Sequence, residues 1–94
     1  MELTDLPNIG PVLAENLHRV GISSAEDLRS IGAWEAWLRV RTQVDSGACF
    51  HQLTALAGAE LGVPKKELPP ERKAELRVFF DRHTKSIRNE KNDV

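Results

Sequence analysis

The stretch LPNIGPVLAENLHRVGI, residues 6–22, decides the fold of this 94-residue chain. Leu6 and Ile9 are apolar and can anchor a turn in the core, and Pro7 between them fixes one backbone angle. Asn8 and Gly10 are the residue types that most readily accept left-handed or open backbone conformations. Pro11 suits the first position of a helix, where its missing amide costs nothing. The stretch therefore predicts a tight hairpin that leads into a helix.

The same hairpin presents backbone groups that can bind an anion. Gly10 has no side chain and the helix begins at Pro11 or Val12, so the unpaired N–H groups of Gly10, Val12 and Leu13 can point outward together. Such amides, aided by the positive end of the helix dipole, bind phosphate. We therefore take Asn8, Gly10, Val12 and Leu13 as candidate nucleic-acid-binding residues. The alternative is that the turn only reverses the chain and leaves its amides to water.

Charge is unevenly distributed along the chain, whose net charge is -1. Residues 1–47 carry 4 Lys and Arg against 7 Asp and Glu, a balance of -3, and residues 48–94 carry 9 against 7, a balance of +2. The hairpin thus lies in the acidic half. Because DNA affinity comes largely from Lys and Arg that displace counterions, any DNA binding there is expected to be weak and sensitive to salt.

Apolar residues at helical spacing, with matching start and stop signals, predict an all-α domain. The expected helices cover about 11–20, 23–32, 33–42, 45–64 and 67–91, although 33–42 also fits a short strand. Ser23 with Glu26 is expected to cap the second helix, and Asp45 or Ser46 the fourth. Cys49 and Leu61 are expected on the buried face of that fourth helix, so the Cys49 thiol is expected to be inert.

Several separated motifs, in order, carry a family resemblance. LTDLPNIGPVLAENLHRVGISSAEDLRSIGA, AWLRVR, CFHQLTALAGAELGV and LPPERKAELRVFF resemble the C-terminal domain of the TfoX/Sxy family of bacterial competence regulators. The hairpin LPNIG is similar to the Leu-Pro-Gly-Ile-Gly hairpin of helix-hairpin-helix motifs, with Asn8 in place of the first Gly. Motif members that bind DNA commonly carry Lys or Arg just after the hairpin, where this chain has Val12 between Asp5 and Glu15.

The resemblance implies a compact domain of about five helices, helix-hairpin-helix or SAM-domain-like. We expect one domain over residues 1–94, standing alone without the family's N-terminal domain, with the hairpin motif at about 3–32 and a polar tail at about 89–94. It also implies a link to transcription of competence genes alongside the cyclic-AMP receptor protein.

Four further residues are candidates for binding. Trp37 is expected in the core, whereas Trp34 is expected to be partly exposed and, with Phe50, available to a protein partner or a second copy of the chain. Arg39 and Arg41 match the family's WLRVR-like stretch, and they can contact phosphate or clamp a carboxylate. The basic residues of the last helix are mixed with acidic ones, which is typical of a solvated helix face. If they form an interaction surface, an acidic protein partner fits it as well as DNA does. These residues are Arg72, Lys73, Arg77, Arg82, Lys85 and Arg88.

No catalytic or metal-binding constellation is apparent in the sequence. The three histidines stand apart from other ligands at metal-binding spacing, and adjacent carboxylates diverge on a helix. With one cysteine and no apolar run of membrane-spanning length, we expect a cytoplasmic protein that is not an enzyme, uses no cofactor and binds no membrane. The expected partner is the backbone of duplex DNA, bound weakly, or a DNA-associated regulatory protein. The alternative is a protein-interaction module in which the hairpin is purely structural and the partner can be a second copy of the chain.

Overall fold

The computed structural model describes the backbone of residues 2–92 and the side chains of residues 2–84. This part of the chain is all-α, as predicted, and the segment after Gly32 is a helix and not a strand. In chain order the elements are the 3-10 turn η1 (Leu3–Asp5), α1 (Pro11–Arg19), α2 (Ala25–Ile31), α3 (Ala33–Gln43), α4 (Phe50–Leu61), the 3-10 turn η2 (Lys65–Glu67) and α5 (Pro70–Asn92).

Glycines and prolines mark the helix ends, as the sequence predicted. Gly21, Gly32 and Gly62 all have positive φ angles, of 84°, 89° and 79°. Gly32 and Gly62 directly follow α2 and α4, and Gly21 follows Val20, the C-cap of α1. Such angles are accessible to glycine without the steric cost that a Cβ brings. Pro11 and Pro70 are the first residues of α1 and α5. The lengths of the helices are therefore encoded locally.

Two predicted caps are wrong in position. Ser24, and not Ser23, caps α2: its hydroxyl accepts from the Asp27 amide at 3.1 Å, and the Asp27 carboxylate accepts from the Ser23 amide at 3.0 Å. The fourth helix begins later than expected, with Cys49 at its N-cap and without a side-chain cap. Asp45 instead accepts from the Gly47 amide within the loop, which is a local turn that competes with helix formation.

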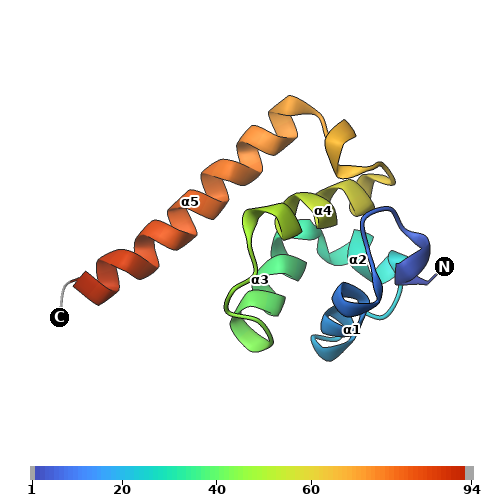
Figure 1. The fold of residues 1–94 in the computed structure, drawn as a ribbon, viewed down its shortest axis with the longest axis horizontal. Coiled ribbons are helices and arrows are strands. Elements are labelled where there is room, and N and C mark those ends of the chain that lie inside the picture. Colours follow the sequence, from blue (N-terminus) through green and yellow to red (C-terminus); the bar gives the residue numbers. More distant parts are fainter. Residues whose placement is uncertain (1, 93–94) are drawn as a thin grey trace.

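The core lies among α1, α2, α3 and α4, and its buried side chains come from all four helices and the segments around them. α1 and α2 lie on the side of α3 and α4 that is away from α5 (Figure 1). α5 contacts α3 and α4 through Phe79, Phe80 and His83 and then projects away from the other helices. Trp37 is fully buried at the centre, as predicted. The other large side chains with almost no exposure are Leu17, Ile22, Leu28, Val40, Leu53, Leu56 and Leu76.

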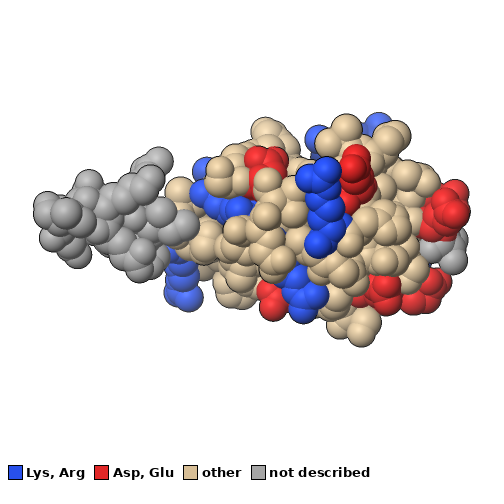
Figure 2. All heavy atoms as spheres, turned by 90° about the horizontal axis from the view of Figure 1, so that it is seen from below, with Lys and Arg blue, Asp and Glu red and all other residues tan. Residues whose placement is uncertain are grey.

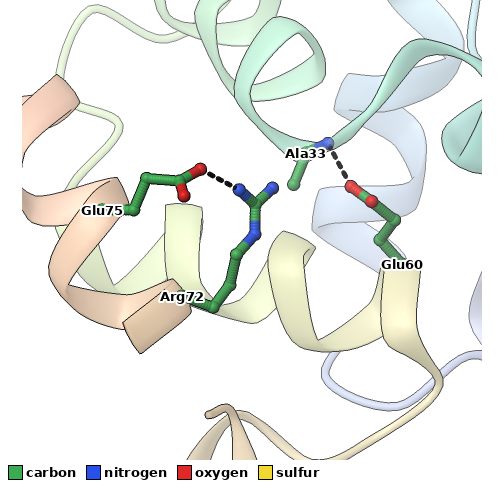
Figure 3. Close-up of polar contacts among 4 residues, drawn as sticks. All are labelled: Ala33, Glu60, Arg72 and Glu75. Atoms are coloured by element: carbon green, nitrogen blue, oxygen red, sulfur yellow. Dashed lines mark hydrogen bonds and ion pairs between the residues drawn. The ribbon is translucent and has the colours of Figure 1, made fainter. Parts of the chain in front are cut away.

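α3 and α4 also hold each other's ends by polar contacts. The Glu60 carboxylate accepts from the Ala33 amide at 2.7 Å, and so caps α3 from a distance (Figure 3). At the other end of the pair, the Trp37 indole N–H donates to the Cys49 carbonyl at 3.1 Å, and Arg41 donates to the Ala48 carbonyl at 3.0 Å. The first-turn amide of α3 and the carbonyls before α4 are thus satisfied through tertiary structure.

The structure corrects the expected burial of two residues. Cys49 is exposed, because it has extended backbone angles (φ -99°, ψ 174°) and stands outside the helical periodicity that placed it in the core. Leu61 is 52% exposed, because it is the last residue of α4 and lies beyond the packed part of the helix. In the expected polar tail, α5 continues to Asn92, and residues 93–94 lie outside the described residues.

Candidate functional site

The hairpin is fastened to the C-terminal end of α4 through one side chain. Asn8 has the left-handed backbone conformation anticipated for it, with φ 71°. Its amide nitrogen donates to the Ala55 carbonyl at 3.2 Å and to the Val63 carbonyl at 3.0 Å, and its amide oxygen accepts from the Lys65 N–H at 3.0 Å. We call this set of bonds the Asn8 clamp. It uses both ends of the side chain for internal contacts, so the Asn8 amide is committed to the fold.

Gly58 makes room for this clamp. A Cβ built on Gly58 would lie 2.6 Å from the Asn8 side-chain nitrogen and 2.7 Å from the Val63 carbonyl oxygen. Both distances are shorter than real Cβ contacts allow. At Gly58 it is the hairpin and the chain after α4 that approach the helix closely.

The other three hairpin candidates lie together at the start of α1. Gly10 is the N-cap, with extended angles (φ -91°, ψ 179°) and no side-chain cap, and a Cβ added to it would meet nothing within 4 Å. Val12 is 75% exposed and Leu13 is half-buried. The surroundings of Gly10 and Val12 are therefore open, but the first turn of α1 carries an exposed valine side chain and not a cation at position 12.

The charges around the hairpin are mixed. Glu15 pairs with Arg19 at 3.2 Å, which leaves Arg19 partly neutralised, and the clamp brings the backbone of Lys65 beside Asn8. On the face shown in Figure 2, Lys and Arg are interspersed with Asp and Glu over a mostly uncharged surface, and acidic side chains gather at the N-terminal end. This face offers no broad basic patch for a phosphate backbone to follow.

The two arginine candidates lie on α3, away from the hairpin contacts. Arg41 donates to the Ala48 carbonyl and places its guanidinium over the rings of Trp37 and Phe80, 5.3 Å and 5.9 Å from their centroids. It is half-buried, so it fastens the loop before α4 to the core instead of clamping a carboxylate. Arg39 is also half-buried.

Trp34 and Phe50 belong to one aromatic cluster that joins α3, α4 and α5. Trp34 stacks on Trp37 with 5.2 Å between centroids and contacts Phe79 at 5.5 Å. Phe50 meets Phe80 edge-on at 5.4 Å. Trp34 is half-buried, as expected, because α5 covers part of it. The cluster mainly anchors α5 to the domain.

A shallow groove between α4, η2 and α5 combines two adjoining hollows with charged lining residues. Its main hollow has a volume of about 520 Å³ and is lined by Phe50, His51, Pro70, Lys73, Ala74 and Arg77. An adjoining hollow of about 210 Å³ shares Phe50, His51 and Lys73 and adds Thr54, Lys65 and Lys66. We call both together the α4–α5 groove.

This groove combines an apolar floor with a basic rim. Arg77 lies over the Phe50 ring, 4.8 Å from its centroid, and pairs with Asp81 at 3.4 Å. Lys65, Lys66 and Lys73 are exposed. Sequence reasoning named Phe50, and it named Lys73 and Arg77 within the basic run of the last helix. It did not bring them together with Lys65 and Lys66, because the cations come from two segments whose charges are mixed with carboxylates.

The described residues contain neither a metal-binding cluster nor a membrane-spanning helix. No group of His, Cys, Asp and Glu there is placed to hold a metal ion. None of the helices described combines the length and apolar character needed to cross a membrane.

Comparison with known proteins assigns the chain to a family. The TfoX C-terminal domain model matches residues 1–80. Protein Sxy of Escherichia coli (strain K12) is 39% identical over 79 residues, which cover 84% of this chain but only 37% of Sxy. A crystal structure of an uncharacterized protein from Listeria monocytogenes, in a triclinic form, matches with a TM-score of 0.87 and 37% identity over 89% of this chain and 94% of that one. A tetragonal-form structure of a protein of unknown function from Listeria monocytogenes matches with a TM-score of 0.79 and 40% identity, over 82% and 93% of the two chains. This chain therefore belongs to the TfoX C-terminal domain family, as its motifs predicted.

Proposed function

We propose that this chain is a non-enzymatic regulatory module of the cytoplasm that acts by contacting another protein in the control of competence-gene transcription, and that its hairpin is structural. The observation that carries this proposal is the Asn8 clamp: the side chain at the apex of the hairpin has its donors and acceptor turned inward onto α4 and η2. The family supplies the regulatory setting. Because the chain spans 37% of Sxy, the role of the whole relative is part of the proposal.

The charges at the hairpin support the same reading. A protein gains most of its DNA affinity from cations, and backbone amides alone supply orientation more than affinity. Val12 presents an exposed methyl surface at the position where a DNA-binding hairpin would need a charge. An exposed aliphatic side chain beside open amides is better suited to a protein surface than to a phosphate.

The second candidate function is weak binding to the DNA backbone. It is favoured by the open surroundings of Gly10, which would let a phosphate approach the first-turn amides of α1 closely.

A matched pair of variants at Val12 separates the two functions. Fluorescence anisotropy with a duplex DNA at low salt should show no binding by wild type, Val12→Lys or Val12→Glu if the hairpin is structural. If the hairpin holds phosphate, wild type binds, Val12→Glu abolishes binding, and Val12→Lys steepens the logarithmic salt dependence by about one unit. The latter pattern would refute the proposal. Light scattering tests whether the protein partner is a second copy, since a strictly monomeric mass excludes a homodimer.

A further inference from the structure

We propose that the α4–α5 groove is a docking site for an acidic amphipathic helix of a protein partner. This inference rests on the proposed function, since it gives the chemistry of the partner and the surface that meets it. The groove is lined by the first turns of α4, by η2 and by the first half of α5, and it lies outside the hairpin that the sequence singled out.

The shape and floor of the groove suit inserted apolar side chains. The main hollow, at about 520 Å³, is open along one side and has Phe50, Pro70 and Ala74 in its lining. A helix that docks in such a groove inserts apolar residues spaced three or four apart and leaves its polar face outside. The apolar floor therefore calls for a partner helix with one apolar face.

The rim of the groove sets the sign of the partner's charge. Its described lining residues include four cations and no carboxylate: Lys65, Lys66, Lys73 and Arg77. The chain as a whole has a net charge of -1, so this concentration of positive charge is local. Acidic residues flanking the inserted apolar ones would face these cations, which orients the helix and disfavours basic partners.

A protein partner fits the groove better than nucleic acid does. Single-stranded nucleic acid is held by open aromatic faces on which bases stack. Phe50 already has the Arg77 guanidinium 4.8 Å from its ring centroid and its edge against Phe80, so it is not an open platform for bases, although it still lines the hollow. A duplex gains affinity from many cations along its backbone, whereas Arg77 already pairs with Asp81 and the groove is concave.

The test is an amide-resolved NMR titration of the full chain with three probes. The first is a synthetic amphipathic peptide with Leu and Phe on one helical face and Glu and Asp on the other. The second is the same peptide with Lys at every acidic position. The third is a short DNA duplex. We expect the acidic peptide to shift the amides of Phe50, His51, Lys73 and Ala74, and the Lys peptide to leave them unchanged.

A pair of charge-reversal variants sharpens the test. Lys73→Glu should weaken the acidic peptide about 5-fold, because it removes one attraction and adds one repulsion at an exposed site. Arg29→Glu changes the net charge equally, but on α2 outside the groove, and should leave the affinity unchanged. Both residues are exposed, so both variants are expected to keep the helical far-ultraviolet circular dichroism of the wild type.

The outcomes distinguish this inference from the function on which it rests. No groove shifts with the acidic peptide, equal binding of the Lys peptide, or equal loss in both variants would overturn the docking site and leave the protein-contact role standing. Duplex DNA that shifts the groove amides would also overturn it, in favour of nucleic acid. Duplex DNA that shifts Gly10, Val12 and Leu13 would instead refute the structural role of the hairpin.

Discussion

Replacement of Asn8 gives a sharp test of the structural role assigned to the hairpin. The Asn8 clamp contains three hydrogen bonds of 3.0 to 3.2 Å. Although the residue as a whole is exposed, each bond should contribute about 0.5–1 kcal/mol net. Asn8→Ala loses all three and also puts a Cβ without a local polar partner at φ 71°, which costs about 1 kcal/mol more. We expect a total loss of about 3 kcal/mol in the free energy of unfolding.

Two companion variants separate the bonds from the backbone strain. Asn8→Gly loses the same bonds but relieves the strained φ angle, so it should cost less than Asn8→Ala, about 1.5–2 kcal/mol. Asn8→Asp keeps the acceptor for the Lys65 amide but turns a carboxylate oxygen toward the Ala55 and Val63 carbonyls. Its cost should equal or exceed that of Asn8→Ala, because a charged acceptor then faces two acceptors.

The assay is urea unfolding followed by far-ultraviolet circular dichroism. The expected order of stability is wild type, Asn8→Gly, Asn8→Ala, with Asn8→Asp equal to or below Asn8→Ala, and the slope with urea should stay unchanged. For a domain of this size each 1 kcal/mol corresponds to about 4–8 °C in Tm. If Asn8→Gly proves as stable as wild type, the three bonds contribute no more than the backbone strain that glycine relieves, and the argument that the hairpin serves the fold is wrong.

Three other variants test the close packing at Gly58, the cap on α3 and the N-cap of α4. Gly58→Ala should destabilise by at least about 2 kcal/mol despite the better helix propensity of alanine, because its Cβ would meet backbone and side chain below 3 Å; unchanged urea unfolding would show that the chain shifts freely there. Glu60→Gln should cost about 1 kcal/mol by weakening the charge-assisted cap on the Ala33 amide, and a Tm equal to wild type would contradict the cap. Cys49→Ser should stabilise by about 0.5–1 kcal/mol, because serine caps helices well and the N-cap of α4 has no side-chain bond; in the wild type the thiol should react with Ellman's reagent without denaturant, and a thiol that reacts only after unfolding would contradict its exposure.

The features that the sequence predicted well are those encoded by neighbouring residues. Pro11, Gly21, Gly32 and Gly62 mark helix ends through their own backbone preferences, and Trp37 reads as core from its helical spacing. The family resemblance depends on motifs spread along the chain and is confirmed over residues 1–80.

The features that it predicted poorly depend on distant residues. The partners of Asn8 are 47 to 57 positions away, so no local pattern shows whether its amide faces outward to a phosphate or inward to α4. Cys49 continues an apolar stripe in the sequence, but the tertiary contacts of Trp37 and Arg41 hold the backbone before α4 extended. The helix therefore begins at Phe50, one residue after Cys49. The α4–α5 groove requires η2 and α5 to meet, which periodicity alone does not place.

The capping of α3 by α4 has a consequence for the order of folding. α3 has no side-chain cap of its own and takes its first-turn partner from the end of α4. The first turn of α3 is therefore incomplete until α4 has formed, and we expect residues 33–61 to fold as one cooperative unit ahead of the elements around them. The N-terminal hairpin, made first during synthesis, would then be among the last parts to reach its final shape, because the anchor for its apex follows more than forty residues later.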